Sequence, residues 1–459
     1  MVSVLESVNA FIWGIPVLFL ILITGIVLCI RSRFAQIRLF PLAVKCFTKS
    51  FQKAENENNT VSGYRALCTA LAATVGTGNI AGVAGAIAIG GPGAIFWMWI
   101  CGLVGMITKF SEVTLAVHYR KKEENGEFVG GPMYTIQNGL AKKYHFLAYI
   151  YCFFCVVAAL GIGNAVQVNA VISGIANVVN TTQSNWGPVH RCVIGVLISL
   201  LLIPIFRNGA KRIGIIAEAL VPIASIIYIL MSFAVLTARF YMIPIALKTI
   251  LKGTFSPLAV TGGMLGSAFS ALRIGASRGV FTNEAGMGTA SIAHAASNVR
   301  HPVQQGLLGI IEVFLDTIVI CTLTALVILC SGVSIPYGAD PGITLSLDAF
   351  AFVLGDWSRV ILTLLTCIFA FATMLGWGLY GARCCQYLFG LNAWKYFVSF
   401  QAAAVVVGSV LNTSVVWILA EMVNGLMAIP NLIAVMALSG VFIGLIKDFQ
   451  KEENAYRLQ

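Results

Sequence analysis

The feature that most constrains this chain is an apolar stretch at residues 69–93, which is long enough to cross a bilayer but is broken near its start. It is TALAATVGTGNIAGVAGAIAIGGPG, and the interruption is Gly76-Thr77-Gly78-Asn79. A continuous helix satisfies its own backbone hydrogen bonds, so a break at membrane depth persists only where the freed groups face protein, a cavity or a ligand. The interruption predicts a binding site. The alternative is close helix packing through Gly78-x-x-x-Gly82.

Composition places the chain in the membrane. Of its 459 residues, 58% are apolar and 10% are charged, and the mean hydropathy is +0.89. These values exclude an ordinary water-soluble protein. A helix needs about 20 apolar residues to cross a hydrocarbon core of roughly 30 Å. We therefore predict an all-α membrane protein with about eleven spans, at 10–30, 64–89, 93–118, 146–178, 189–206, 214–238, 257–293, 303–332, 351–385, 396–413 and 415–446.

The net charge of +11 is distributed unevenly between the two sides of the membrane, which argues against a nucleic-acid partner. If the spans alternate, one side receives the basic loops 31–53, 119–145 and 207–212, together with the C-terminal residues. The other side receives only Arg191, Arg239, Lys248, Lys252 and Arg359. The positive-inside rule predicts a multi-pass protein of the cell membrane with its N-terminus outside and its C-terminus in the cytoplasm. The basic and apolar segment 31–63 is expected to lie along the cytoplasmic surface.

The spans repeat in pattern. After the first span, five spans run from 64 to 238 and five from 257 to 446, and each set opens with a glycine-interrupted helix. The second interruption is predicted at residues 274–279, IGASRG. Because five is odd, the two sets are inverted relative to each other, as in secondary transporters. The predicted units are a first helix with its amphipathic segment (1–63), two five-helix repeats (64–238 and 239–446) and a tail (447–459). The alternative is two unrelated glycine clusters.

Several long motifs resemble one known family. They are TVGTGNIAGVAGAIAIGGPGAIFWMW, GGPMYTIQNG, GNAVQVNA, RIGASRGVFTNEAGMGTASIAHAA and WGLYGARCCQYLFG. In sequence and order they are similar to the alanine or glycine:cation symporter family, over residues 60 to 446. The resemblance implies a leucine-transporter-like fold and sodium-coupled import of alanine and often glycine by alternating access. No cofactor is expected apart from sodium as the coupling ion.

The first interruption offers groups for a zwitterionic amino acid. The amides near Thr77, Gly78 and Asn79 begin the outer half-helix, where N–H groups and the helix dipole favour a carboxylate. By similarity to the fold, Thr74 and Gly78 are also expected to contact substrate through their backbones.

Sodium is expected on the other side of this break. The carbonyls of Ala72 and Val75 end the inner half-helix and are suitable for a cation that prefers hard oxygen ligands. Similar folds supply a hydroxyl ligand from the helix that includes Thr373, so Thr373 completes the predicted sodium site.

Side chains near the breaks are the next candidates. Asn79 is predicted to contact substrate or cation, although an asparagine there also suits a helix cap. Gln167 resembles the family's substrate-contacting glutamine, with an interhelical hydrogen bond as the alternative. In the second interruption, Gly275 is expected to open the backbone and Ser277 to bind substrate. Trp377 is predicted to close over the substrate side chain, or else to serve in packing.

Charged residues at membrane depth are expensive and therefore candidates for function. Arg278 and Glu284 are expected either to gate the site or to form a structural ion pair. Lys109 and Glu112 are interpreted as a surface pair near a helix end.

Glu312 and Asp316 lie four residues apart on one helix face. They are interpreted as charges paired with nearby basic residues, with a proton relay as the alternative. The alternative function is a symporter of the same fold driven by protons or selective for another small amino acid. A channel would need a continuous polar pathway, and the scattered histidines offer no catalytic site, so no enzyme is expected.

Overall fold

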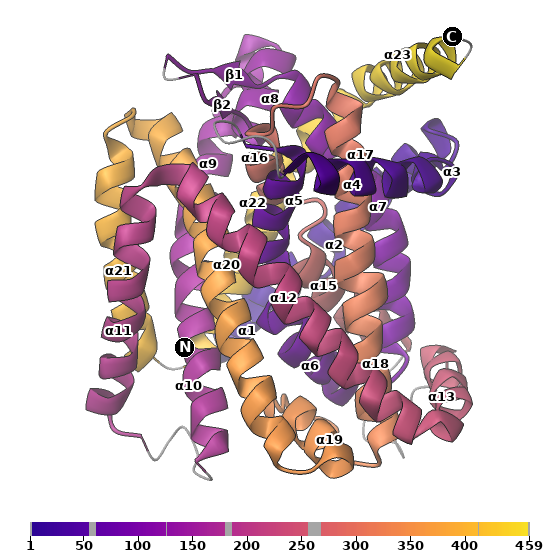
Figure 1. The fold of residues 1–459 in the computed structure, drawn as a ribbon, viewed down its shortest axis with the longest axis vertical. Coiled ribbons are helices and arrows are strands. Elements are labelled where there is room, and N and C mark those ends of the chain that lie inside the picture. Colours follow the sequence, from indigo (N-terminus) through magenta and orange to yellow (C-terminus); the bar gives the residue numbers. More distant parts are fainter. Residues whose placement is uncertain are drawn as a thin grey trace.

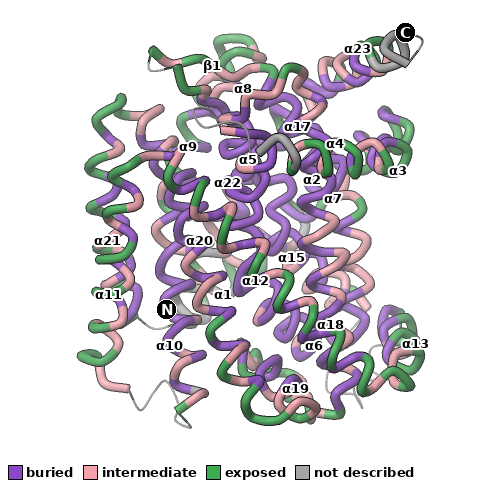
Figure 2. Tube along the Cα trace, viewed as in Figure 1, coloured by how far each residue is buried: buried purple, intermediate pink, exposed green. Residues whose placement is uncertain are grey.

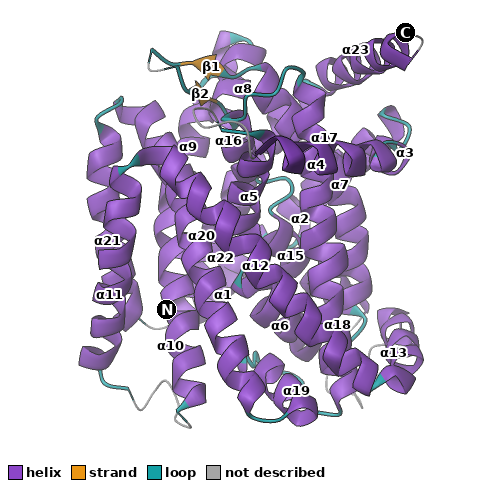
Figure 3. Cartoon of the chain, in the orientation of Figure 1, coloured by secondary structure: helices purple, strands orange, loops and turns teal. Residues whose placement is uncertain are grey.

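The computed structural model describes residues 2–54, 61–124, 126–179, 186–255, 268–411 and 413–457. These residues form a bundle of long helices with one short antiparallel hairpin, which pairs β1 (Lys121–Lys122) with β2 (Phe128–Val129) (Figures 1 and 3). The elements of the first half are α1 (Val2–Ile12), α2 (Ile15–Arg31), α3 (Ala35–Arg38), α4 (Phe40–Ala54), α5 (Gly63–Thr74), η1 (Gly78–Gly82), α6 (Val83–Gly90), α7 (Ala94–His118), α8 (Pro132–Gly139), η2 (Lys142–Tyr144), α9 (Phe146–Leu160), η3 (Gly161–Val166), α10 (Gln167–Val178), α11 (Pro188–Arg207) and α12 (Gly209–Ala238). Those of the second half are η5 (Phe240–Met242), α13 (Ile243–Phe255), α15 (Ala268–Asn283), α16 (Thr289–Ala295), α17 (Pro302–Val313), η6 (Phe314–Cys321), α18 (Thr322–Ser331), α19 (Thr344–Leu354), α20 (Trp357–Phe389), α21 (Ala393–Val410), α22 (Thr413–Ala437) and α23 (Ser439–Arg457).

Eight helices of the described chain are long and apolar enough to cross a membrane, and two bent helix pairs raise that number to ten. The bent pairs are Gly63–Thr74 with Gly78–Gly90, at 50°, and Glu421–Ala437 with Ser439–Glu452, at 57°. The prediction of a multi-pass helical membrane protein is confirmed, whereas the count of eleven spans is not. The first eleven residues of the predicted seventh span, 257–267, lie outside the described residues.

The first predicted interruption is present. The helix α5 begins after Ser62, whose hydroxyl accepts a hydrogen bond from the Arg65 amide at 3.1 Å, a normal N-cap. It ends at Thr74, because Val75 adopts an extended conformation with ψ of 98°. The chain then resumes as a π-helical turn, η1, which continues into α6.

The second interruption does not lie where the sequence predicted it. The helix α15 continues through residues 274–279 and ends only at Asn283. The break falls at residues 284–288, where Glu284, Gly286 and Gly288 have positive φ values of 53°, 95° and 76°. The helix α16 follows from Thr289. The predicted break at 274–279 is therefore wrong by about ten residues.

The glycines of 274–279 serve packing. A Cβ atom on Gly275 would lie 2.2 Å from the Ala94 carbonyl oxygen of α7, and one on Gly279 would lie 3.2 Å from the Cys101 Cβ. Close approach of two helices through small residues is typical of membrane bundles. Gly275 thus allows α15 to contact α7, and it does not open the backbone.

The two broken helices lie against each other inside the bundle. The helix α5 contacts α16, and η1 contacts α15. Gly78 faces Phe281 and Thr282 at the end of α15, since a Cβ there would lie 3.2 Å from the Thr282 Cγ2. Buried residues fill this centre, and exposed residues follow the outer faces of α11, α12 and α21 (Figure 2). Large apolar side chains such as Leu200, Leu230 and Phe400 are exposed on those faces, as expected of a surface that contacts lipid.

The polar segments gather at one end of the bundle. The amphipathic segment predicted at 31–63 includes α3 and α4, and α4 lies crosswise to the long helices near α17 (Figure 1). The loop 119–145 contains the β1–β2 hairpin and α8 at the same end. The helices α13 and α19 lie at the opposite end. The residue limits of the two five-helix repeats stay a prediction.

Candidate functional site

The break between α5 and η1 is held open by the Asn79 side chain. Its Oδ1 accepts a hydrogen bond from the Gly76 amide at 2.8 Å, so that amide does not bond the Ala72 carbonyl as it would in a continuous helix. The Asn79 Nδ2 donates to Asp316 of η6, at 2.6 Å to Oδ1 and 3.2 Å to the carbonyl oxygen. Asn79 therefore has the geometry of a cap, and its contact with a substrate stays a prediction.

Thr77 and Gln167 meet beside this break. The Thr77 hydroxyl donates to Gln167 Oε1 at 3.1 Å, and Gln167 Nε2 donates to the Ile162 carbonyl oxygen at 3.2 Å. Ile162 belongs to the π-helical turn η3, whose irregular geometry leaves carbonyl oxygens available to side chains. Two predicted substrate residues from separate helices are thus brought together.

A cavity of about 440 Å³ reaches Thr77 from the end of the bundle where α19 lies. Thr77, Ala81 and Gly82 line it from the first broken helix, and Asn169 and Ser173 line it from α10. Its volume falls in the range of small-molecule sites, and it contacts the backbone just after the break. Thr77 is the predicted substrate residue that lines this cavity.

Arg278 of α15 lines the cavity and contacts two acidic side chains that also line it. Its Nη1 lies 3.0 Å from Glu421 Oε1 of α22, and its Nη2 lies 3.4 Å from Asp340 Oδ2 in the loop before α19. The Asn9 side chain of α1 also donates to Glu421 at 2.8 Å. The predicted alternative of an Arg278–Glu284 pair is wrong, because Arg278 lies mid-helix toward the cavity and Glu284 lies beyond the end of α15.

The groups predicted to bind sodium lie on the other side of the break. Thr373 of α20 is 2% exposed, and its hydroxyl has no hydrogen-bond partner among the described residues. A Cβ on Gly76 would lie 2.6 Å from that hydroxyl, so it faces the break directly. Ala72 lies in the last turn of α5 and Val75 directly after it, and whether their carbonyls join Thr373 in one cation site stays a prediction. An unsatisfied buried hydroxyl beside a helix break is consistent with a monovalent hard cation.

The remaining predicted substrate residues lie in packed positions. Trp377 is 1% exposed, contacts Gly163 of η3 and lies at 5.9 Å from the Tyr380 ring, outside the cavity wall. Thr74 is buried, and its hydroxyl donates to the Ala70 carbonyl oxygen at 3.3 Å. Ser277 is half-buried within α15. In this conformation Trp377 packs against η3, and its role in enclosing a substrate stays a prediction.

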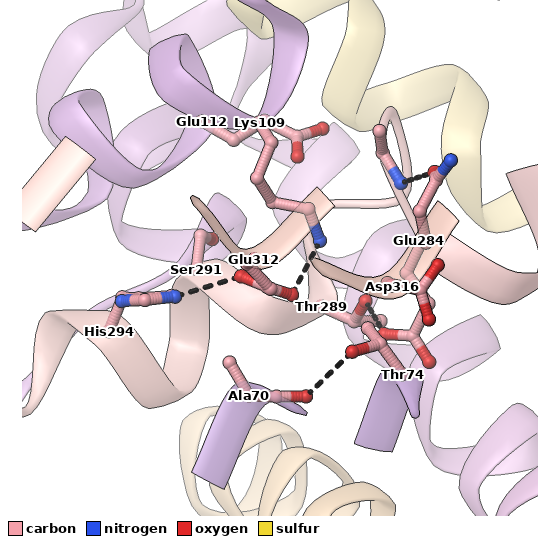
Figure 4. A network of polar contacts seen from close by, with 12 residues as sticks. Ala70, Thr74, Lys109, Glu112, Glu284, Thr289, Ser291, His294, Glu312 and Asp316 are labelled. Atoms are coloured by element: carbon pink, nitrogen blue, oxygen red, sulfur yellow. Dashed lines mark hydrogen bonds and ion pairs between the residues drawn. The ribbon is translucent and has the colours of Figure 1, made fainter. Parts of the chain in front are cut away.

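A buried network of charged residues adjoins the site (Figure 4). Lys109 Nζ of α7 lies 3.2 Å from Glu312 Oε1 of α17, and His294 Nε2 of α16 lies 2.9 Å from Glu312 Oε2. Glu112 accepts a hydrogen bond from Asn431 Nδ2 of α22 at 2.6 Å. The predicted Lys109–Glu112 surface pair is wrong, since both side chains are buried where α7 packs against α16, α17 and α22. The prediction that Glu312 and Asp316 pair with basic residues is confirmed for Glu312 and wrong for Asp316, whose carboxylate accepts hydrogen bonds from Asn79 and Thr317.

This network contains more acids than bases. Glu284 accepts a hydrogen bond from the Thr289 hydroxyl, and Asp316 accepts one from the Thr317 hydroxyl at 2.8 Å, but neither has a basic partner in the described chain. Four carboxylates of the network therefore face one lysine and one histidine. Uncompensated buried charge costs several kcal/mol. Three of them, Glu112, Glu284 and Asp316, form no ion pair in the described chain, and Asp316 connects these acids directly to Asn79.

Sequence reasoning missed three parts of the site. Asp340 carries no distinguishing pattern, since it lies in a loop, whereas Asn169 lies in the quoted motif GNAVQVNA beside Gln167. Glu421 did carry a signal, because it is an acidic residue within an apolar span. A lone acid in such a span is reason to look for a basic partner on another helix.

Two adjacent broken helices in a bundle of apolar helices, with a cavity reaching the first break, define a secondary transporter of the leucine-transporter type. A comparison with solved structures agrees on the fold. A solved structure, that of MhsT in complex with L-phenylalanine, superposes with a TM-score of 0.58 at 12% identity, covering 85% of this chain and 99% of that one.

The chain belongs to the sodium:alanine symporter family, whose model matches residues 1–458. It is 41% identical over 459 residues to the sodium/alanine symporter AgcS of Methanococcus maripaludis, covering 98% of this chain and 97% of the relative. It is 42% identical over 451 residues to an uncharacterized transporter of Haemophilus influenzae, covering 97% and 96%. It is 36% identical over 451 residues to the "Probable sodium/glutamine symporter GlnT" of Bacillus subtilis, covering 97% and 90%. The protein is therefore a cation-coupled amino acid symporter of the membrane and not an enzyme.

Proposed function

We propose that the protein imports small neutral amino acids, alanine and also glycine, together with sodium. The observation that carries this proposal is the first break, where freed backbone groups lie at the end of a cavity of about 440 Å³. The relative AgcS is named a sodium/alanine symporter, whereas GlnT is named for glutamine. The choice of substrate is therefore a property that has to be measured.

The amino acid carboxylate is proposed to bind at the start of η1. The amide of Gly78 lies at a helix N-terminus, which favours negative charge, whereas the Asn79 amide donates to the Gly76 carbonyl oxygen at 3.3 Å. Thr77 donates its hydroxyl hydrogen to Gln167 Oε1 at 3.1 Å, so a substrate carboxylate would take over that donor, and Gln167 Nε2 has a second hydrogen beside the one that it donates to Ile162. Asn79 acts indirectly in this arrangement, because its acceptor oxygen maintains the break.

Sodium is proposed to bind between the Ala72 and Val75 carbonyls and the Thr373 hydroxyl. An ion there would connect α5 to α20 and fix the backbone that also presents the substrate amides. Sodium and amino acid would then favour the same conformation of one segment. Thermodynamic linkage requires each to increase the affinity of the other by the same factor.

Proton coupling is the second candidate, and the excess of buried carboxylates favours it. Asp316 accepts a hydrogen bond from Asn79, so a proton or cation that binds to Asp316 would change the contact that Asn79 makes at the break. In this alternative Asp316, rather than Thr373, carries the coupling ion. The two candidates differ in which gradient drives uptake.

Uptake into proteoliposomes distinguishes these functions. Radiolabelled alanine would be supplied under an inward sodium gradient or under an inward proton gradient in choline. Unlabelled glycine, alanine, glutamine and leucine would serve as competitors. We expect accumulation with sodium alone, and inhibition by alanine and glycine but not by leucine. Accumulation with the proton gradient alone would favour the second candidate, and preferential inhibition by glutamine would replace alanine as the substrate.

A further inference from the structure

A second cavity, of about 860 Å³, lies far from the transport site, at the bundle end that carries the β1–β2 hairpin. Its walls come from the turn between α11 and α12 and from the adjoining ends of α20 and α21. A smaller hollow of about 310 Å³ shares Asn208 with it. Neither hollow contains a residue of the cavity at Thr77.

The two hollows are strongly basic. Five basic side chains line them against two acidic ones, Glu123 and Glu127, which leaves an excess of three positive charges. The basic residues are Arg207, Lys211, Arg212, Arg383 and Lys395. Arg383 lies 2.8 Å from Glu127, but the other four form no ion pair in the described part of the chain. Two of these four cations line each of the two adjoining hollows, and the larger hollow alone has three basic side chains against two acidic ones. This positive charge favours an anionic ligand.

The start of α12 also favours an anionic ligand. Asn208, Gly209 and Ala210 form part of the wall, and they begin a helix of 30 residues. The Asn208 side chain donates to the Pro204 carbonyl oxygen at 2.7 Å and does not cap α12. The first amides of α12 therefore have no side-chain cap and add a positive dipole end to the basic cavity.

Apolar side chains, Leu391 and Trp394 among them, line part of the cavity, and other apolar residues of α20 and α21 are exposed. Phe389, Leu391, Tyr396 and Phe400 are each at least 65% exposed at this end of α20 and α21, and Leu391 also lines the cavity. Trp394 lines it too and donates its Nε1 to the Phe206 carbonyl oxygen at 3.0 Å. Basic residues next to exposed aromatic residues are typical of the membrane interface. A soluble anion would use the charges alone, whereas a lipid would use both the charges and the exposed apolar side chains.

We propose that this basic cavity binds the headgroup of an anionic phospholipid, with its phosphate near Arg207, Lys395 and the first turn of α12. The acyl chains would follow the exposed apolar faces of α11 and α21. The helix α12 also forms an ion pair with the first broken helix, Arg65 to Glu218 at 2.7 Å. A lipid that fixes the start of α12 is therefore expected to stabilise the transporter.

The test compares lipids on the full-length purified protein. Melting temperature would be followed during titration with phosphatidylglycerol or phosphatidylcholine in mixed micelles, and native mass spectrometry would count retained lipids. Glycerol 3-phosphate provides the soluble headgroup alone. The test variant is Arg207→Gln with Lys395→Gln, at two exposed positions. The control, Lys248→Gln with Lys252→Gln, removes two exposed lysines from α13 at the opposite end.

We expect phosphatidylglycerol to raise the melting temperature more than phosphatidylcholine does, and glycerol 3-phosphate to have no effect. In the test variant, the apparent affinity for phosphatidylglycerol should fall about fivefold for each basic side chain removed, and one fewer lipid should be retained. The control variant should behave as the unmodified protein. An equal response of the test variant and the control would overturn the proposal, because the effect would then be diffuse electrostatics. Stabilisation by glycerol 3-phosphate equal to that by phosphatidylglycerol would overturn it in favour of a soluble anion. If the double variant does not fold, Lys395→Glu alone provides the same comparison.

Discussion

The Asn79–Asp316 contact offers the sharpest prediction about how the first break is maintained. Replacing Asn79 by Ala removes the acceptor of the Gly76 amide and the donor to the Asp316 carboxylate, which lie at 2.8 and 2.6 Å. Loss of a capping interaction costs about 1 kcal/mol. Loss of a hydrogen bond to a buried charged group costs about 2 kcal/mol. We expect Asn79→Ala to lower the free energy of unfolding by about 3 kcal/mol and to weaken sodium-dependent alanine binding.

Asn79→Asp perturbs the same contact differently. The carboxylate keeps an acceptor for the Gly76 amide but places two acids within hydrogen-bond distance, where they need to share a proton. Low pH supplies that proton, so the defect in alanine binding should be largest at alkaline pH and should decrease as the pH falls. The unmodified protein, assayed over the same pH series, provides the baseline.

The double variant Asn79→Asp with Asp316→Asn exchanges the two groups. An amide at 316 can again donate to a carboxylate at 79, so binding and melting temperature should recover in part compared with either single variant. The assay is thermal shift with alanine in sodium buffer. Normal binding by Asn79→Asp at pH 8, with no coupling between the two positions, would refute the idea that this contact maintains the break.

Three further predictions concern separate residues. Thr373→Val keeps the side-chain shape but removes the unpartnered hydroxyl, so the sodium concentration for half-maximal alanine binding should rise about tenfold with little change in melting temperature. Thr366→Val on the same helix is the control, because its hydroxyl bonds the Leu362 carbonyl oxygen. Glu312→Gln leaves Lys109 charged and without its partner, and it should destabilise the protein by about 3–5 kcal/mol in chemical unfolding, whereas replacing both by apolar residues should cost less. Trp377→Ala should cost about 3–5 kcal/mol; strong inhibition by leucine in competition assays would place Trp377 in the pocket, and an unchanged preference for alanine over leucine would leave it a packing residue.

The first break was predictable because its chemistry is local. Two glycines and a capping asparagine fall within four apolar-flanked residues, and few other structures accommodate that pattern at membrane depth. The second break was misplaced because glycine serves two purposes in membrane helices. Gly275 and Gly279 permit contact with α7, whereas Gly286 and Gly288 adopt the positive φ values that end α15. Spacing alone does not separate packing glycines from hinge glycines.

The charged network was harder to predict from the sequence than the first break, because its partners are far apart along the chain. Lys109 and Glu112 are three residues apart and resemble a surface pair, but Lys109 bonds Glu312 on α17. Asp316 and Asn79 are separated by 237 residues and meet only because η6 packs against η1. The Thr77–Gln167 contact itself was not predicted: the helix dipole indicated Thr77 and the family resemblance indicated Gln167, without placing them together.

We propose that sodium and the amino acid bind to opposite sides of one backbone break and strengthen each other. Calorimetric titration of the purified protein with alanine at increasing sodium concentrations, and with sodium at increasing alanine concentrations, is the decisive measurement. We expect no alanine binding in choline, and a gain in alanine affinity with sodium that equals the gain in sodium affinity with alanine. Alanine binding of equal strength in choline and in sodium would show that the two ligands are not coupled at this break.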